Sequence, residues 1–185
     1  TVREDFIKDI KREITNIQFL VANLLKLSKL DANSVQFINK EVKVEEIIQN
    51  VVKNVSSICD LKNIKINITG DPKAKIVCDE RWQIEAITNI VKNAAEHSRT
   101  DSEIDISYEQ NKVYTKIVIK DYGVGINSKD LKHIFQRFYK SKNSAKDSIG
   151  IGLPLAKSII ERNNGYIEVT SEEGKGTTFT IKYLK

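Results

Sequence analysis

The sequence predicts an α+β protein, namely a two-layer α/β sandwich with a mixed, mostly antiparallel sheet, preceded by one long amphipathic helix. Three observations favour this class. The chain has 185 residues, 40% of them hydrophobic, which suffices for one main core and a smaller appendage. Near the N-terminus, apolar residues recur at helical spacing. Further on, strand-like runs alternate with helical runs, and several strand-like runs are hairpin neighbours.

Residues 2–30 form the first predicted element, a long amphipathic helix. Its apolar stripe comprises Ile10, Ile14, Ile17, Val21 and Leu24, widened by Leu20, Leu25, Leu27 and Leu30. A stripe this wide needs a partner, and the turn residues 31–34 lead the chain away from it. We therefore expect residues 1–33 to be half of a helical hairpin with no partner inside the chain, and residues 34–185 to be a separate domain.

The other predicted elements build the sandwich. Strands are expected at 37–43, 64–69, 75–78, 103–109, 112–121, 165–170 and 177–183, and helices at about 44–60, 80–97 and 153–163. A hairpin across Gln110-Asn111 joins antiparallel strands, so we expect a mixed or antiparallel sheet rather than a doubly wound one. Residues 136–150 are polar, without a clear period, and long enough to form a lid.

Composition argues against several classes of protein. The chain is 30% charged and has no apolar run near 18 residues, so it contains no predicted membrane span or signal peptide. The net charge of +5 comes from 30 basic residues interleaved with 25 acidic ones, which is typical of a mixed surface rather than of nucleic-acid binding. Cys59 and Cys78 lack metal-ligand spacing, so we expect reduced, buried thiols in a cytoplasmic protein.

Two polar features can contact a nucleotide. Asn89 and Asn93 stand four apart on one face of a predicted helix, and an amide oxygen suits Mg²⁺ that carries phosphates. A predicted strand ends at Asp121, whose carboxylate can accept a hydrogen bond from the amino group of adenine. Gly123 and Gly125 then let backbone and ligand come close. Taken singly, each pattern is also typical of a solvated helix face or an ordinary turn.

Two glycine turns complete the set. Gly150 and Gly152 lead into a helix with Pro154 in its first turn, which points free N–H groups and the positive end of a helix dipole at an anion. Residues 174–179 form a tight turn into the last strand. A plain helix start and a plain hairpin are the alternatives.

The order and spacing of these features resemble the N, G1, F, G2 and G3 boxes of the histidine kinase ATPase domain over roughly residues 41–185, with 134–140 as the F box. Residues 1–33 resemble the second helix of that family's dimerisation and phosphotransfer hairpin. The resemblance implies transfer of the γ-phosphoryl group of ATP to a histidine, and relay to the receiver domain of a response regulator. It also implies a homodimer through the hairpin, and a membrane anchor only in regions outside this sequence.

The resemblance also implies roles for single residues. Asn93 would ligate Mg²⁺, Asp121 would bind the adenine amino group, and Lys140 or Arg137 would reach the phosphates across a lid that runs from Phe138 to Gly152. The remaining implied nucleotide contacts are Asn89, Lys92, His97, Gly123, Gly125, Ile126, Tyr139, Gly150, Ile151, Leu153 and Thr177.

Three positions depart from the family pattern. Glu96 stands where Lys is frequent, and we expect it to turn outward because an acid pointing inward would repel the triphosphate. Ser148 replaces the first glycine of the G2 box. His97 and His133 are the two histidines, and neither has the context of the phosphoacceptor, so we expect the acceptor on a helix preceding Thr1.

Other activities stay open. An ATP hydrolase of the gyrase or MutL type resembles the chain in its Asn and Asp motifs, but those hydrolases place a Glu general base where this chain has Asn89, which cannot take a proton from water. A nucleotide-switched module without catalysis is a second alternative. An anti-sigma-factor serine kinase, which would not normally carry the helix at 2–30, is a third.

Overall fold

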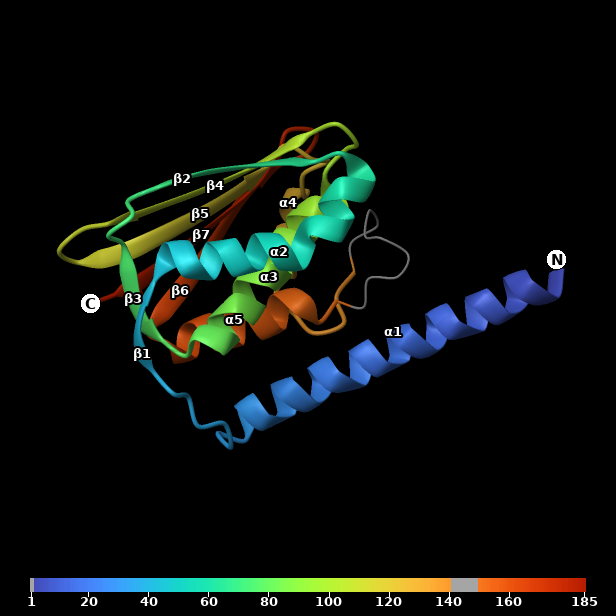
Figure 1. The fold of residues 1–185 in the computed structure, drawn as a ribbon, viewed down its shortest axis with the longest axis horizontal. Coiled ribbons are helices and arrows are strands. Elements are labelled where there is room, and N and C mark those ends of the chain that lie inside the picture. The colour runs from blue at the N-terminus through green and yellow to red at the C-terminus, as the bar shows by residue number, and fades with distance from the viewer. Residues whose placement is uncertain (1, 141–149) are drawn as a thin grey trace.

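The computed structural model describes residues 2–140 and 150–185 and confirms the predicted fold class. A long helix, α1 (Val2–Asp31), precedes a sandwich in which helices cover one face of a five-stranded sheet (Figure 1). The main covering helices are α2 (Val44–Lys62), α3 (Glu80–His97) and α5 (Gly152–Arg162).

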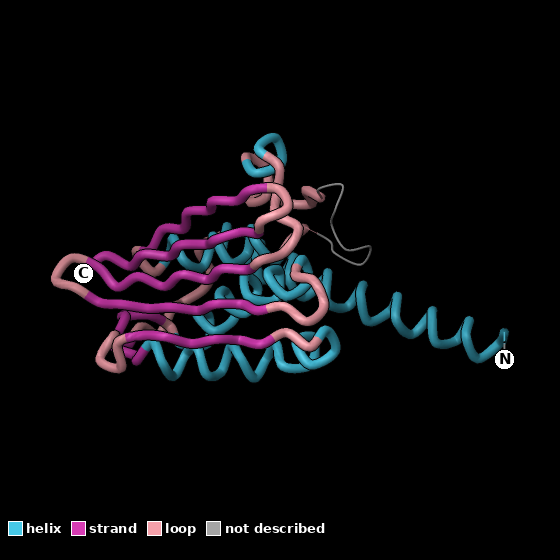
Figure 2. Tube along the Cα trace, turned by 90° about the horizontal axis from the view of Figure 1, so that it is seen from above, coloured by secondary structure: helices cyan, strands magenta, loops and turns pink. Residues whose placement is uncertain are grey.

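The large sheet has the strand order β2-β4-β5-β7-β6 and is mostly antiparallel. Only its β2–β4 pair is parallel. The strands are β2 (Lys65–Gly70), β4 (Glu103–Gln110), β5 (Tyr114–Asp121), β6 (Gly165–Glu172) and β7 (Gly176–Leu184). Figure 2 shows these strands side by side, with the helices against one face of the sheet and the N-terminal part of α1 projecting beyond it.

The core lies between this sheet and the three helices. Strand β5 alternates buried and partly exposed residues, as expected for a sheet that is covered on one face, and its buried side ends at Asp121. Ile117, Ile119 and Phe179 are fully buried against Ile87 and Ile90 of α3 and their neighbours. The alternation that defines the core therefore also sets the direction in which Asp121 points.

Two local features differ from the sequence prediction. The strand expected at 37–43 begins only at Lys40, in a separate two-stranded sheet of β1 (Lys40–Lys43) and β3 (Lys75–Cys78). The N–H of Ile38 instead donates to the Asp79 carboxylate (2.9 Å), which also caps α3. A short helix, α4 (Ser128–Leu131), was not predicted because four residues are too few to show a helical period.

Helix α1 divides into two parts. Toward its C-terminal end, Leu27 and Leu30 are buried against the sandwich, where α1 packs on α5. The prediction that the apolar stripe has no partner inside the chain is therefore wrong for this part. Further toward the N-terminus, the stripe remains exposed at Phe6, Ile7, Ile10, Ile14 and Ile17. Over residues 2–140 and 150–185, no helix combines the length and apolar character needed to cross a membrane.

Candidate nucleotide site

Asp121 lies at the C-terminal end of β5 with its side chain almost fully buried. Its Oδ1 accepts hydrogen bonds from the backbone N–H of Gly123 (2.9 Å) and of Thr177 (3.3 Å). Burial raises the pKa of this carboxyl above its ordinary value, while the two N–H donors oppose the shift. The result is a desolvated hydrogen-bond acceptor, with one oxygen fixed by the backbone.

The loop after Asp121 is packed too closely for side chains at its two glycines. A Cβ on Gly123 would lie 2.2 Å from the carbonyl oxygen of His97, and one on Gly125 would lie 2.1 Å from that of Glu172. Gly125 also has a φ of +69°, which favours glycine. The N–H of Val124 donates to the same His97 carbonyl (3.2 Å), so the loop joins the end of α3 to the β6–β7 hairpin. This brings together His97, the two glycines and Thr177, which the sequence placed in one site.

The rest of this loop is held by the hairpin. The N–H of Ile126 donates to Ser171 Oγ (2.8 Å), and Ser171 Oγ in turn donates to the carbonyl of Gly176 (2.9 Å). Ile126, a predicted contact, is thus tied through its backbone, and its side chain is partly exposed.

The Asn-bearing face of α3 meets the start of α5. A Cβ on Gly152 would lie 3.4 Å from Asn89 Oδ1, an ordinary van der Waals contact, so the Asn89 side chain lies beside the start of α5. Asn89 Nδ2 is buried and has no hydrogen-bond partner among the described residues. Asn93 lies one helical turn beyond Asn89 on α3. At the start of α5, the N-cap residue Ile151 supplies no side-chain hydrogen bond. An unpaired donor and an N-terminus without a side-chain cap are groups that an anionic ligand can satisfy.

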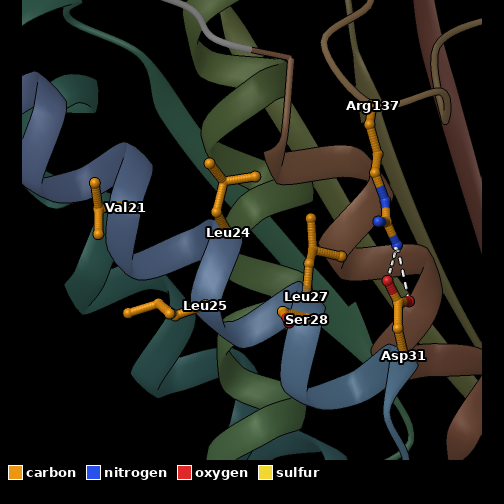
Figure 3. A pocket seen from close by; sticks show the side chains of 7 residues that line it. All are labelled: Val21, Leu24, Leu25, Leu27, Ser28, Asp31 and Arg137. Carbon is orange, nitrogen blue, oxygen red and sulfur yellow. Dashed lines mark hydrogen bonds and ion pairs between the residues drawn. The ribbon is translucent and has the colours of Figure 1, made fainter.

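Two of the three predicted phosphate cations, Arg137 and Lys92, have other partners. The Arg137 guanidinium donates to both carboxylate oxygens of Asp31, at 2.8 and 2.7 Å (Figure 3). The Lys92 ammonium lies 4.8 Å from the centre of the Phe19 ring on α1, and 3.8 Å from a carboxylate oxygen of Glu96. Arg137 and Lys92 are thus both in contact with residues of α1.

Glu96 does not turn out to solvent as expected. Its side chain is 24% exposed and lies beside Lys92, within the last turns of α3. Burial raises the pKa of its carboxyl, and the charges of Lys92 and Lys62 oppose that rise. The nearby ammonium groups therefore compensate part of the cost of an acid at this position.

The two ends of the predicted lid meet at a neck. The N–H of Phe138 donates to the carbonyl of Gly150 (2.9 Å), and both residues have positive φ. Tyr139 Oη donates to Asp130 of α4 (2.5 Å) and its ring lies 5.3 Å from that of His133. Lys140, exposed, is the last residue described before 141–149. Ser148 and the body of the predicted lid lie outside the described residues.

A cavity of about 400 Å³ opens between α1 and Arg137. Its lining is mostly apolar and comprises Val21, Leu24, Leu25, Leu27, Ser28, Asp31 and Arg137 (Figure 3). Two further contacts hold α1 nearby, an ion pair between Lys26 and Glu85 and a hydrogen bond from Arg162 to the Leu30 carbonyl. Sequence reasoning did not anticipate these contacts or Lys62, which donates to three carbonyls at the end of α3.

A sandwich that joins a buried aspartate, a close-packed glycine loop and an Asn-bearing helix defines a nucleotide-binding class of domain. Residues 78–185, more than half of the chain, match the family described as histidine kinase-, DNA gyrase B-, and HSP90-like ATPase. The chain belongs to this family.

Known proteins resemble the chain beyond this domain. Sensor histidine kinase YxdK of Bacillus subtilis (strain 168) is 31% identical over 188 residues, covering 98% of this chain and 57% of YxdK. The chain thus spans less than two thirds of that relative. Full-length ShkA in complex with AMPPNP has a TM-score of 0.83 at 19% identity, covering 99% of this chain and 39% of ShkA. Histidine kinase ThkA in complex with response regulator protein TrrA has a TM-score of 0.77 at 21% identity, with coverages of 97% and 50%. At these identities, the two structures show a shared fold that includes α1.

Proposed function

We propose that this chain is the ATP-binding catalytic part of a sensor histidine kinase, which transfers the γ-phosphoryl group of ATP to a histidine outside residues 1–185. A response regulator receiver domain would then take the phosphoryl group. The observation that supports this best is Asp121, a buried carboxylate whose Oδ1 is fixed by two backbone N–H groups. Such an acceptor suits the exocyclic amino group of adenine.

The chain's own residues divide the work of binding. Asp121, Gly123 and Thr177 hold the adenine end, with Gly125, Ile126 and His97 around them. Asn89, Ile151, Gly152 and Leu153 face the phosphates where α3 meets α5, and the unpaired Asn89 donor fits an anion there. Lys92, Arg137, Phe138, Tyr139, Lys140 and Gly150 complete the phosphate side. Positioning and charge neutralisation are the main contributions to phosphoryl transfer, and these groups are suited to both.

Mg²⁺ fits the donor set at Asn93. Among the described residues, no group of three or more His, Cys, Asp or Glu could hold a metal ion by itself. Mg²⁺ usually keeps several waters and needs only one or two protein ligands besides phosphates, so a single amide oxygen from Asn93 is appropriate. When bound, the ion would neutralise charge on the phosphates.

The exposed part of α1 supports a homodimer through a helical hairpin. The N-terminal part of α1 projects beyond the sandwich (Figure 1), and its apolar residues Phe6, Ile7, Ile10, Ile14 and Ile17 are exposed. A partner helix would remove these side chains from water. We also propose that the chain is the cytoplasmic portion of a membrane-anchored sensor, in keeping with the sensor kinases that it resembles.

The assignment of Asp121 is tested by calorimetry with ATP and Mg²⁺. Asp121→Asn replaces one acceptor oxygen by an NH₂ donor, and losing a charged hydrogen bond costs about 1.5–3 kcal/mol, so the affinity should fall about 10- to 150-fold. Asp105→Asn is the matched control, because this carboxylate accepts hydrogen bonds from Asn67 on the neighbouring strand β2 and from Tyr122, which follows β5. Equal affinities for wild type and Asp121→Asn would remove the assignment.

A pair of assays separates a kinase from a hydrolase. Asn89 cannot deprotonate water, so phosphate release from ATP should be slow, while a separately made helix bearing the acceptor histidine should become phosphorylated. Both are measured on one wild-type sample with labelled ATP. Rapid hydrolysis without transfer would replace the kinase by the hydrolase, and binding without either reaction would favour a nucleotide-switched module.

A further inference from the structure

Lys62, the last residue of α2, holds the C-terminal end of α3. Its Nζ donates to the carbonyl oxygens of Ala95 (2.9 Å), Glu96 (2.6 Å) and Ser98 (3.1 Å). An ammonium group has three N–H donors, so these bonds use all of them. The carbonyls at this end of a helix lack intrahelical partners and carry the negative end of the helix dipole, which a lysine charge complements.

Among the carbonyls of residues 95–98, the one that Lys62 does not bind belongs to His97. That oxygen accepts the N–H of Val124 (3.2 Å) and leaves no room for a side chain on Gly123. The last turn of α3 is therefore held between the Lys62 ammonium and the loop that follows Asp121. The N–H of Gly123 in turn donates to Asp121 Oδ1, so packing and hydrogen bonds link this turn to the carboxylate.

The backbone of Lys62 and the side chain of Asn63 are hydrogen-bonded to Asp101. The Lys62 backbone carbonyl accepts the N–H of Asp101 (2.9 Å), and the side chain of the next residue, Asn63, donates to the Asp101 carboxylate (2.6 Å). Asn63 ends α2 in the left-handed conformation, and its N–H bonds the carbonyl of Asp60. These bonds join the end of α2 to the segment that follows α3, and the Lys62 ammonium adds a second link between the two helix ends.

We propose that Lys62 is a positioning residue for recognition of the nucleotide base. By holding the carbonyls on one side of the α3 turn, it fixes the His97 carbonyl on the other side against Gly123, and thereby the place of Asp121 relative to adenine. Lys62 does not contact the nucleotide. The inference rests on the nucleotide site proposed above.

The test compares ATP with inosine triphosphate, which has a carbonyl oxygen in place of the adenine amino group. Calorimetry on the whole chain, well below the melting temperature, gives both dissociation constants. In Lys62→Met, we expect the dissociation constant for ATP to rise about tenfold, with that for inosine triphosphate nearly unchanged. Lys62→Arg keeps the charge and the donors and should retain most of the preference for ATP.

Lys53→Met is the matched control, because Lys53 is an exposed lysine of the same helix. It should leave both constants unchanged. If Lys62→Met is too unstable to assay, Lys62→Gln, which keeps two N–H donors, provides the same comparison. An equal loss for both nucleotides would indicate a purely structural cap and overturn the proposal, as would an unchanged preference. A wild-type chain that binds neither nucleotide would instead refute the proposed function.

A second readout locates the ammonium group. Burial and then the charge of Lys62 lower the pKa of His97. Removing that charge in Lys62→Met should raise the His97 pKa, whereas Lys53→Met should not. The chain has two histidines, so imidazole titration by NMR can separate His97 from His133. An unchanged His97 pKa would show that the ammonium does not lie at this turn, and would overturn the proposal.

Discussion

Asp121 receives its hydrogen bonds from Gly123 and Thr177 within the sandwich, whereas Arg137 donates its hydrogen bonds to Asp31 of α1. The adenine side of the proposed site, around Asp121, is therefore formed by the ATPase domain alone. The phosphate side, which includes Arg137, depends on where α1 lies. Since α1 is a separate element that packs only through its C-terminal part, the phosphate side can change with the position of α1 while the adenine side does not.

The largest expected effect comes from loosening α1. Leu27 is 1% exposed and Leu25 is 57% exposed on the same helix. Leu27→Ala should lower the free energy of unfolding, or that of undocking α1 from the sandwich, by about 2–5 kcal/mol, because it leaves a cavity between them. Leu25→Ala should change it by less than about 0.5 kcal/mol. Urea denaturation measures both.

The same pair tests the independence of the adenine side. Affinity for AMP, which lacks the β- and γ-phosphates, should be the same in Leu27→Ala as in wild type, provided that the sandwich stays folded. A parallel loss of AMP affinity would mean that α1 also supports the Asp121 end, and the contrast between the two ends would fail.

Sequence patterns predicted the structural elements around Asp121 because their determinants are local. The alternation in β5, the glycines that follow it and the hairpin before β7 each occupy a short stretch, and the predicted strands at 112–121 and 177–183 agree with β5 and β7 to within two residues. The close approach of Gly123 to the end of α3 follows once these elements pack.

Sequence patterns could not predict the contact between Arg137 and Asp31, because its determinants are far apart in the sequence. Arg137 and Asp31 are 106 positions apart, and neither residue differs locally from an ordinary exposed charge. The docking of Leu27 likewise depends on the path of the turn after α1, which side-chain periodicity does not specify. Lys62 carried a weak signal, since a lysine at the end of a helix is a frequent cap, but its bonds are to a different helix.

A smaller expected effect concerns stability without nucleotide. Burial raises the pKa of Asp121, so its protonated carboxyl group contributes stability to the fold below about pH 3.9. That stability is lost as the pH rises through the pKa of the folded state. Asp121→Asn keeps an oxygen for the two N–H donors and removes the buried charge. At pH 7, the variant without nucleotide should therefore melt at or above the wild-type temperature, although it binds ATP less well.

The pKa of Asp105 is shifted in the opposite direction, which gives a comparison for the effect of pH on stability. Its hydrogen bonds from Tyr122 and Asn67 lower the pKa of the carboxyl, so its contribution is present above about pH 3.9 and is lost as the pH falls through the folded pKa. Relative to wild type, Asp105→Asn should be less stable at pH 7, and the difference should shrink in acid. Melting curves of both variants from pH 3 to 7 that shift in the same direction would contradict this account.

The smallest expected effect is on the pair that joins α1 to the phosphate side. Asp31→Asn removes the charge that holds Arg137, and an exposed pair of this kind contributes about 0.2–1 kcal/mol. If the released guanidinium reaches the phosphates, the affinity for ATP should rise about two- to fivefold and that for AMP should not change. Asp9→Asn is the control, because Asp9 pairs with Arg12 on the surface of α1, away from the sandwich. The effect of Asp31→Asn should also fade at high salt, since exposed charges are screened. An equal gain in affinity for ATP and AMP, or the same gain in Asp9→Asn, would show that the pair with Asp31 does not keep Arg137 from the phosphates.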